Sequence, residues 1–227
     1  MIVAAHQPCY LPDLSFFYKA RNADVFVLTD DFQYASHDRI NRAQIKTASG
    51  RSWLTVPVRT KGRQRQLIHQ VQIDHQQNWR HKHWKSLLVN YQYAPYFELY
   101  ADFLESLYKK SWRRLLELNL EIIYFLMACL RMTSSVVLSS EWQIHGRGVP
   151  RVFALIEKSQ CDTFLVEQKY ANYLSQNKWL EKRVKIQYFK SPTPVYHQQF
   201  DDFTDGLSVV DLLFNEGEMS REILMGP

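Results

Sequence analysis

A histidine and a glutamine stand at the end of a short apolar run near the start of the chain. The run covers residues 2–5, and His6 and Gln7 follow it before two prolines. Proline fixes its own φ angle and lacks a backbone N–H, so a helical pattern resumes only at Asp13, a common capping residue. A buried strand that ends at polar side chains ahead of a helix is typical of how open α/β sheets present chemistry. We therefore predict that His6 is a catalytic general base, and that Gln7 and Tyr10 bind substrate.

An acid ends the second apolar run, residues 24–30, which follows a predicted helix at about residues 13–22. Two strands joined through a helix form a βαβ unit with parallel pairing. Since the carboxyl ends of parallel strands lie side by side, the sequence predicts that Asp30 approaches His6 and supports it as the second catalytic residue. The alternative interpretation is that Asp30 only caps a turn.

The segment 32–50 is polar and rich in side chains that bind anions and amides. Few apolar residues interrupt it, so we predict an active-site loop here. Its cationic side chains would hold a phosphate or carboxylate group of the substrate. The predicted substrate-binding residues of this loop are Arg39, Asn41, Arg42 and Lys46.

Strands and helices alternate along the rest of the chain. Apolar alternation and helical periodicity predict strands at 51–58, 67–74, 136–138, 162–167 and 184–189, and helices at about 78–91, 98–108, 111–131, 149–159, 170–179 and 207–215. This order indicates an α/β fold, a three-layer sandwich with a mainly parallel sheet and a helical segment in the middle of the chain. No linker or repeat divides the sequence, which predicts one domain over residues 1–227 with a helical insertion at about 78–131.

The composition favours a globular protein with a small anionic ligand over a nucleic-acid binder. The chain has 227 residues, is 46% hydrophobic and carries a formal net charge of +5. Basic residues gather at Arg59, Lys61, Arg63 and Arg65, which predicts either a solvated face or a rim that attracts a phosphate-bearing ligand. Acidic residues elsewhere nearly balance this charge and no nucleic-acid-binding module is recognisable, so no nucleic-acid partner is expected.

The cysteines and the longest apolar segment bear on the compartment. Cys9, Cys129 and Cys161 are widely spaced and form no C-x-x-C pair, which is typical of a reducing environment. No secretory leader is visible, and acidic residues interrupt the apolar segment 115–130, so no membrane span is predicted. We expect a cytoplasmic protein. Histidines at metal-binding spacing are absent, so no metal site is predicted, and the sequence names no cofactor.

Several motifs occur in the order of a known family. They are His6-Gln7-Pro8-x-Tyr10-Leu11-Pro12, Asp24-Val25-Phe26-Val27-Leu28-Thr29-Asp30, Asn41-Arg42, Leu54-Thr55-Val56-Pro57-Val58, Ala94-Pro95-Tyr96-Phe97 and Leu207-Ser208-Val209-Val210-Asp211-Leu212-Leu213-Phe214-Asn215. On these motifs the chain resembles the WbqC-like family of bacterial proteins over nearly its whole length. The resemblance implies a role in O-antigen or other surface-polysaccharide (lipopolysaccharide) biosynthesis and adds weight to Asn41 and Arg42. The chain departs from its relatives at Asp13 and Ser15, where they have Trp and Gly, and at residues 166–168, where they have small residues.

Two functions of different classes fit these observations. The first is a transferase, with acyl or aminoacyl transfer to an amino sugar or nucleotide-linked sugar as its concrete form, acting on a sugar nucleotide or an activated acyl donor. The strand, polar tip and helix order also resembles that of nucleotidyltransferases, although their second histidine and their glycine are missing. The second function is a non-catalytic partner of a glycan-pathway enzyme, which would use exposed aromatic residues and the basic cluster as contacts.

Overall fold

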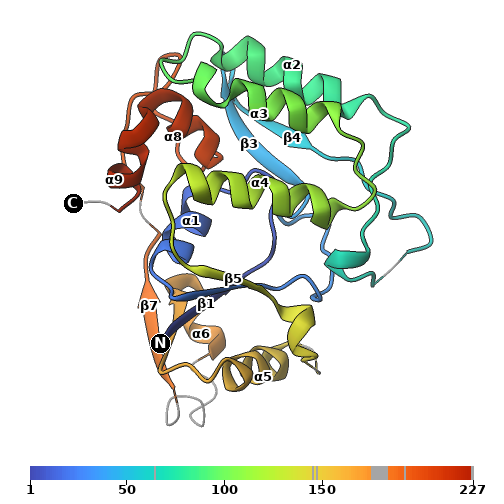
Figure 1. Ribbon diagram of the computed structural model, residues 1–227, viewed down its shortest axis with the longest axis vertical. Coiled ribbons are helices and arrows are strands. Elements are labelled where there is room, and N and C mark those ends of the chain that lie inside the picture. Colours follow the sequence, from blue (N-terminus) through green and yellow to red (C-terminus); the bar gives the residue numbers. More distant parts are fainter. Residues whose placement is uncertain (64, 145, 147, 175–183, 192, 226–227) are drawn as a thin grey trace.

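A parallel sheet forms the centre of the molecule (Figure 1). The computed structural model describes residues 1–63, 65–144, 146, 148–174, 184–191 and 193–225. Within them the sheet has five strands in the order β5-β2-β1-β6-β7, and every neighbouring pair is parallel. The strands are β1 (Ile2–His6), β2 (Val25–Leu28), β5 (Ser135–Leu138), β6 (Thr163–Glu167) and β7 (Lys185–Phe189).

Apolar side chains alternate between the two faces of the central strand, since successive residues of a strand point to opposite sides. Ala4 of β1 packs into the larger of two hydrophobic clusters, together with Phe26 and helix residues such as Phe16. Val3 packs into the second cluster with Phe153 of α5 (Val149–Ser159). Helices therefore cover both faces of the sheet, which confirms the predicted three-layer α/β sandwich.

Helices from both ends and from the middle of the chain cover the first face. Figure 1 shows α1 (Leu14–Arg21) and α4 (Leu115–Cys129) on one side of the sheet and α5 on the other. α4 is apolar around most of its circumference and buries Leu115, Leu118, Ile122 and Leu126. α2 (Trp79–Tyr91) and α3 (Glu98–Lys109) complete the helical segment that the sequence predicted in the middle of the chain.

The segment predicted as an active-site loop contains a strand. β3 (Arg42–Thr47) and β4 (Gly50–Thr55) pair as an antiparallel hairpin outside the main sheet. Ala43 and Ile45 are buried while Gln44 between them is more exposed, so a half-buried alternation was hidden among polar side chains. Gly50 has a φ angle of +93°, which a glycine adopts without strain at the hairpin turn. The predicted strand 51–58 is therefore β4, in the hairpin.

The predicted strand over residues 67–74 is wrong. This segment has a 3₁₀ turn at Ile68–Gln70 and isolated bridges from Leu67 to Gln33 and from Gln72 to Arg114. Ile68 and Val71 are buried because the segment lies over the core as a covering strap. An alternating pattern alone does not distinguish such a strap from a ladder strand.

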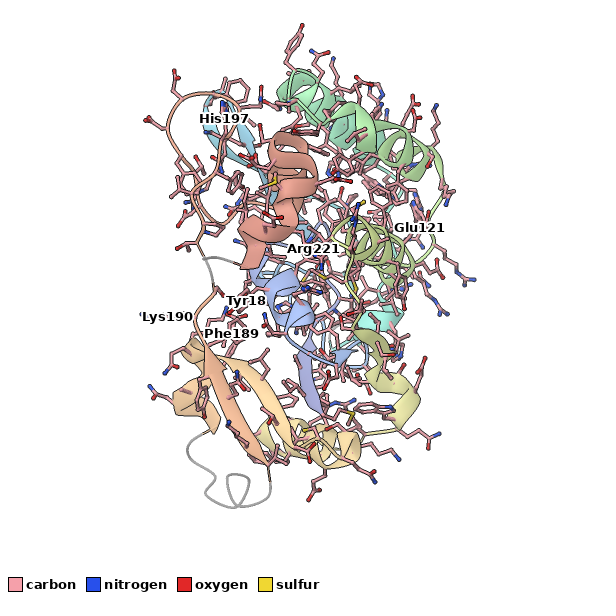
Figure 2. All side chains as sticks on the ribbon, turned by 60° about the vertical axis from the view of Figure 1, so that its left-hand side comes forward. Tyr18, Glu121, Phe189, Lys190, His197 and Arg221 are labelled. Atoms are coloured by element: carbon pink, nitrogen blue, oxygen red, sulfur yellow. The ribbon has the colours of Figure 1, made fainter. Side chains whose placement is uncertain are left out.

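The C-terminal part follows the prediction in outline. The predicted helix 170–179 begins as α6 (Ala171–Leu174), and its remainder lies outside the described residues. α8 (Val209–Glu216) corresponds to the predicted helix 207–215 and is followed by α9 (Ser220–Met225). Figure 2 shows Tyr18 of α1 beside Phe189 of β7, and their ring centroids are 5.3 Å apart. β7 therefore packs against the first helix of the fold.

Candidate functional site

The strand order creates a crevice between β1 and β6. From β1 the chain adds β2 and β5 on one side, and then returns to add β6 and β7 on the other. In doubly wound sheets, ligands bind outside the carboxyl ends of the strands at the point where the order reverses. A cavity of about 490 Å³ lies at this point and reaches Gln7 at the end of β1 and Val166 of β6. This volume is in the range of small-molecule sites.

The cavity has apolar walls and a few polar side chains. Val152 and Leu155 of α5 and Phe164 of β6 contribute to the walls. The polar residues that line it are His6, Gln7, Lys19, Thr29, Asp38 and Tyr170. Such a combination binds an apolar body and fixes its orientation through a few polar contacts.

His6 is held as a neutral imidazole in one tautomer. Its Nδ1 lies 2.9 Å from the carbonyl oxygen of Gln7, and because a carbonyl can only accept, Nδ1 donates and Nε2 keeps its lone pair. The ring of Phe16 packs edge-on against the imidazole, with centroids 5.0 Å apart. Burial, and then the positive charge of Lys19, lower the pKa of His6 to about 4. His6 therefore enters the cavity as a hydrogen-bond acceptor at neutral pH.

A network of charges lies beside the cavity. Nζ of Lys19 donates to the carbonyl oxygen of Ala5 at 3.2 Å and lies 3.6 Å from Oε1 of Glu167. The same carboxylate contacts Nζ of Lys169 at 2.5 Å and accepts from the hydroxyl of Ser15 at 3.0 Å. Burial by itself would raise the pKa of Glu167, but the hydrogen bond from Lys169 and the charges of both lysines lower it. Glu167 is therefore a carboxylate at neutral pH.

Asp30 is turned toward β5 and away from the cavity. Its carboxylate accepts from the backbone N–H of Ser140 at 2.9 Å and from the Ser140 hydroxyl at 2.7 Å, and it is almost fully buried. It is not among the residues that line the cavity with His6. β2 has β1 on one side and β5 on the other. The hydrogen bonds of the Asp30 carboxylate are with the tip of β5, and Nδ1 of His69 lies 3.9 Å from it. The parallel pairing predicted that Asp30 approaches and supports His6. Its carboxylate instead accepts hydrogen bonds from Ser140, so Asp30 joins the end of β2 to the end of β5.

Tyr10 lies in the core rather than on the cavity. Its hydroxyl contacts Nδ1 of His83 at 2.9 Å and the hydroxyl of Tyr108, and its side chain is fully buried. The prolines on either side of Tyr10 place the β1–α1 connection against α2 and α3. Tyr10 therefore anchors the loop that follows His6 and Gln7.

The arginines predicted to hold an anion bind groups within the protein. Arg39 donates to the Asp13 carboxylate at 2.9 Å and to the Gly206 carbonyl oxygen at 3.0 Å. Arg42 donates to the carbonyl oxygen of His37, and its guanidinium lies 4.6 Å from the ring centroid of Trp53. Both side chains fasten the hairpin region to its surroundings.

The two other residues predicted from this segment are also engaged in the fold. Nδ2 of Asn41 donates to the carbonyl oxygen of Val56 at 2.8 Å. Nζ of Lys46 donates to the carbonyl oxygen of Asp202 at 2.6 Å and is buried. Asp38, from the same segment, does line the cavity. Segment 32–50 therefore contributes Asp38 to the cavity, a residue that was not among the predicted substrate-binding residues.

The sequence carried a signal for one of the missed cavity residues. Lys19 follows Phe16 by three residues, so it occupies the buried side of the first predicted helix. A charge at such a position is rarely found without a partner or a function. Thr29, Asp38 and Tyr170 had no comparable signal, because nothing in the sequence told which loop would face the crevice.

Cys9 lies beside His6 but is not an activated nucleophile. Its thiol donates to the Gln7 carbonyl oxygen at 3.3 Å, and Sγ is 3.8 Å from Nδ1 of His6. Burial raises the pKa of Cys9 far above its ordinary value, so it stays a thiol. In the part of the chain that the structure describes, no group of three or more His, Cys, Asp or Glu side chains is placed to hold a metal ion. Nor does any helix there have the length and apolar character needed to cross a membrane.

The fold and the cavity define a class: a doubly wound α/β protein with a small-molecule cavity at the switch point of its sheet. The chain belongs to the WbqC-like protein family, whose sequence model matches residues 7–223. It is 29% identical to the uncharacterized protein Rv1507c of Mycobacterium tuberculosis (strain ATCC 25618 / H37Rv) over 224 residues, which are 98% of this chain and 96% of the relative. No solved structure matches the chain. The family predicted from the motifs is therefore confirmed.

Proposed function

We propose that the protein is a transferase that binds a small anionic substrate in the cavity at the switch point and uses His6 as general base. The observation that carries this proposal is the hydrogen bond from Nδ1 of His6 to the Gln7 carbonyl oxygen, at 2.9 Å. It leaves Nε2 as the proton acceptor on a ring that lines the cavity. A positioned base of this kind contributes about 10²- to 10⁴-fold to a rate.

The reaction that fits is transfer of an acyl or aminoacyl group to an amine or hydroxyl of a sugar. Nε2 of His6 accepts the proton of the attacking group as its nitrogen or oxygen forms a bond to the acyl carbon. The bond from that carbon to the leaving group then breaks, and the leaving group takes the proton from His6. Gln7, which also lines the cavity, supplies an amide for orienting the substrate.

The substrate itself would adjust the basicity of His6. With its pKa lowered to about 4, His6 is a weak base in the empty cavity. The charge of Lys19 is one cause, so an anionic substrate near Lys19 offsets it and raises the pKa of His6 toward neutrality. His6 would then become a stronger base when the substrate is bound.

A place in surface-polysaccharide biosynthesis is part of the same proposal. It is supported by the family to which the chain belongs.

A screen for product formation tests the proposal. The purified protein is incubated with pools of acyl donors and of amino sugars, free or nucleotide-linked, and products are detected by the mass of the transferred group. We expect a product with the wild type and with His81→Gln, which alters an exposed histidine of α2. His6→Gln should form product at least 100-fold more slowly. Equal rates for His6→Gln and the wild type would refute the role of His6.

The alternative is a non-catalytic partner of a glycan-pathway enzyme. It draws on the large exposed side chains of Val89, Tyr93 and Leu99 on and beside α2 and α3. Apolar groups of this size are typical of contact surfaces where they form a contiguous patch. If the alternative is correct, the double substitution Tyr93→Ser and Leu99→Ser abolishes binding to the partner enzyme. The transferase proposal instead expects the double variant to transfer the group at the wild-type rate.

A further inference from the structure

Lys19 is a buried ammonium group whose hydrogen-bonding capacity is mostly unused. Its side chain is 5% exposed, and it lines the cavity. Among the described residues its one hydrogen bond is to the Ala5 carbonyl oxygen, at 3.2 Å. The nearest carboxylate oxygen, Oε1 of Glu167, is 3.6 Å away, which is beyond a normal hydrogen bond. An ammonium has three protons to donate, so two of them lack a well-placed acceptor.

Glu167 has other close partners besides Lys19, although the positive charge of Lys19 also helps to lower its pKa. Lys169 contacts its carboxylate at 2.5 Å and Ser15 donates to it at 3.0 Å. Lys19 is thus the second cation beside a carboxylate that is already paired. A buried charge with incomplete compensation is costly to the fold, and such a cost is commonly retained for binding.

We propose that Lys19 binds the carboxylate of a singly charged, otherwise apolar substrate, and that this carboxylate is a binding group and not the acyl carbon that is transferred. This inference rests on the proposed function for its place in a reaction, but it concerns binding alone. The carboxylate would accept hydrogen bonds from the two N–H groups of Lys19 that lack an acceptor, and the apolar body would pack against Val152, Leu155 and Phe164. Glu167 would stay with Lys169 and Ser15.

The charges around the cavity favour one negative charge over several. Lys19 is the cation among the described cavity residues, Asp38 is an acid, and His6 is neutral. A nucleoside diphosphate would therefore bring about three negative charges to a lining with no net positive charge.

The usual place for a pyrophosphate is also occupied. Doubly wound folds hold it on a glycine-rich turn at the N-terminus of the first helix. Here residues 7–13 contain no glycine, and the Asp13 carboxylate accepts from the backbone N–H of Phe16 at 3.2 Å. A second anion at this end of α1 would be repelled by Asp13.

The ionisation of Lys19 agrees with this role. Burial lowers the pKa of Lys19, while the nearby Glu167 partly restores it. A carboxylate bound to the ammonium would raise that pKa, and it would also relieve the effect of Lys19 on His6. Binding and base activation would then be coupled.

Calorimetric titration with three probes tests the proposal: 3-phenylpropionate, its uncharged amide, and ADP. We expect the wild type to bind the carboxylate about ten- to hundredfold more tightly than the amide, the usual range for a hydrogen bond to a charged group. Lys19→Met should lose this preference. Lys82→Met, an exposed lysine of α2, should keep it. Circular dichroism checks that each variant is folded, and Lys19→Gln replaces Lys19→Met where the latter is not.

Several results would overturn the proposal. They are equal affinity of the wild type for the carboxylate and the amide, a preference that survives in Lys19→Met, carboxylate binding weaker than about 10 mM, and tighter binding of ADP than of the carboxylate. His6→Gln is expected to bind the carboxylate like the wild type. If the wild type shows no preference for the carboxylate but His6→Gln still loses turnover, the Lys19 assignment alone is wrong. If the carboxylate preference depends on Lys19 but His6→Gln keeps its turnover, the transferase proposal alone is wrong.

Discussion

At the residue scale, the protonation of His6 is the feature on which the chemistry depends. The carbonyl of Gln7 fixes its tautomer, and the burial of the ring and the charge of Lys19 keep it neutral. These are properties of two neighbouring groups and not of the histidine alone. The first prediction therefore concerns the coupling between His6 and Lys19.

Replacing Lys19 by methionine should raise the pKa of His6. In the wild type we expect His6 to titrate at about 4, and in Lys19→Met at a value between that and the ordinary 6.5, because burial persists while the positive charge is gone. Nitrogen-15 NMR of the imidazole measures both the titration and the tautomer. Lys82→Met serves as the control and should leave the titration unchanged. A wild-type His6 that titrates near 6.5 would contradict the burial and the neighbouring charge described here.

Two of the residues that the sequence predicted for the site lie on the cavity. His6 and Gln7 line the cavity, as expected for polar residues at the end of a buried strand. Arg39, Arg42 and Lys46 instead bind carboxylate or carbonyl groups of the protein. Residue type tells what a cation can bind but not whether an internal acceptor reaches it first. Three-dimensional packing decides that.

At the scale of elements, a polar cluster joins the β1–α1 connection to α2 and α3. Nδ1 of His83 lies 2.9 Å from the hydroxyl of Tyr10, which also contacts Tyr108. Burial lowers the pKa of His83 to about 4, against a small opposing effect of a hydrogen bond with the backbone of Thr55. The cluster therefore requires a neutral imidazole.

The stability of the fold should fall as pH falls through this window. The unfolded chain binds a proton at His83 near pH 6.5 and the folded chain only near pH 4, so acid favours unfolding between these values. The contribution is fully present above about pH 6.5 and amounts to about 3 kcal/mol that is lost toward pH 4. Urea unfolding at several pH values measures it. His83→Gln should reduce the slope but not remove it, because the pKa of His6 is also lowered to about 4 and His6 contributes in the same pH window. An unchanged slope in this variant would assign the acid sensitivity to other groups.

A buried carboxylate fastens α8 to the rest of the molecule. Asp211 is fully buried and accepts hydrogen bonds from the hydroxyls of Tyr91 and Tyr196, each at 2.8 Å. Asp211→Ala leaves both hydroxyls without this acceptor, so we expect the free energy of unfolding to fall by about 3 kcal/mol. Asp205→Ala, which breaks the exposed contact with Arg51, should change it by less than about 1 kcal/mol. Equal effects of the two substitutions in urea unfolding would refute the role of Asp211.

Periodicity predicted the elements of the main sheet better than those outside it. β1, β2 and β6 are short apolar runs, and the sequence shows them directly; β2 and β6 bury most of their residues, and β1 buries Val3 and Ala4. β3 was missed because polar residues alternate with only two buried apolar ones, Ala43 and Ile45. At residues 67–74 the error is the opposite, because a strand was predicted where the structure has none. The buried residues of this strap resemble those of a strand, but it is joined to its neighbours only by isolated bridges.

At the scale of the whole molecule, the order of the strands creates the site. The sequence predicted a parallel three-layer fold, but not that β6 would return to the free side of β1. Strand order depends on which way each crossover turns across the sheet, and no local pattern encodes that choice. The residues of the cavity come from strands and helices far apart in the chain for this reason.

The basic cluster lies at the end of a segment that is connected to the cavity. Arg59, Lys61, Arg63 and Arg65 are exposed, and the backbone N–H of Tyr34, two residues after the cavity residue Phe32, donates to the carbonyl oxygen of Gln66 at 3.0 Å. Neutralising all four with glutamine should weaken binding of 3-phenylpropionate at low salt, and the difference from wild type should vanish at high salt, because exposed charges are screened beyond about 10 Å at 0.1 M. Calorimetry at two salt concentrations measures this. The same affinity as wild type at low salt would identify the cluster as a solvated face.

The most direct test of the account is the rate of group transfer by His6→Gln, measured beside the wild type and His81→Gln with the substrates that the screen identifies. We predict that His6→Gln is folded, with a free energy of unfolding within about 1 kcal/mol of the wild type, and that its rate is about 10²- to 10⁴-fold lower. His81→Gln should match the wild type. A folded His6→Gln that transfers the group at the wild-type rate would contradict the account.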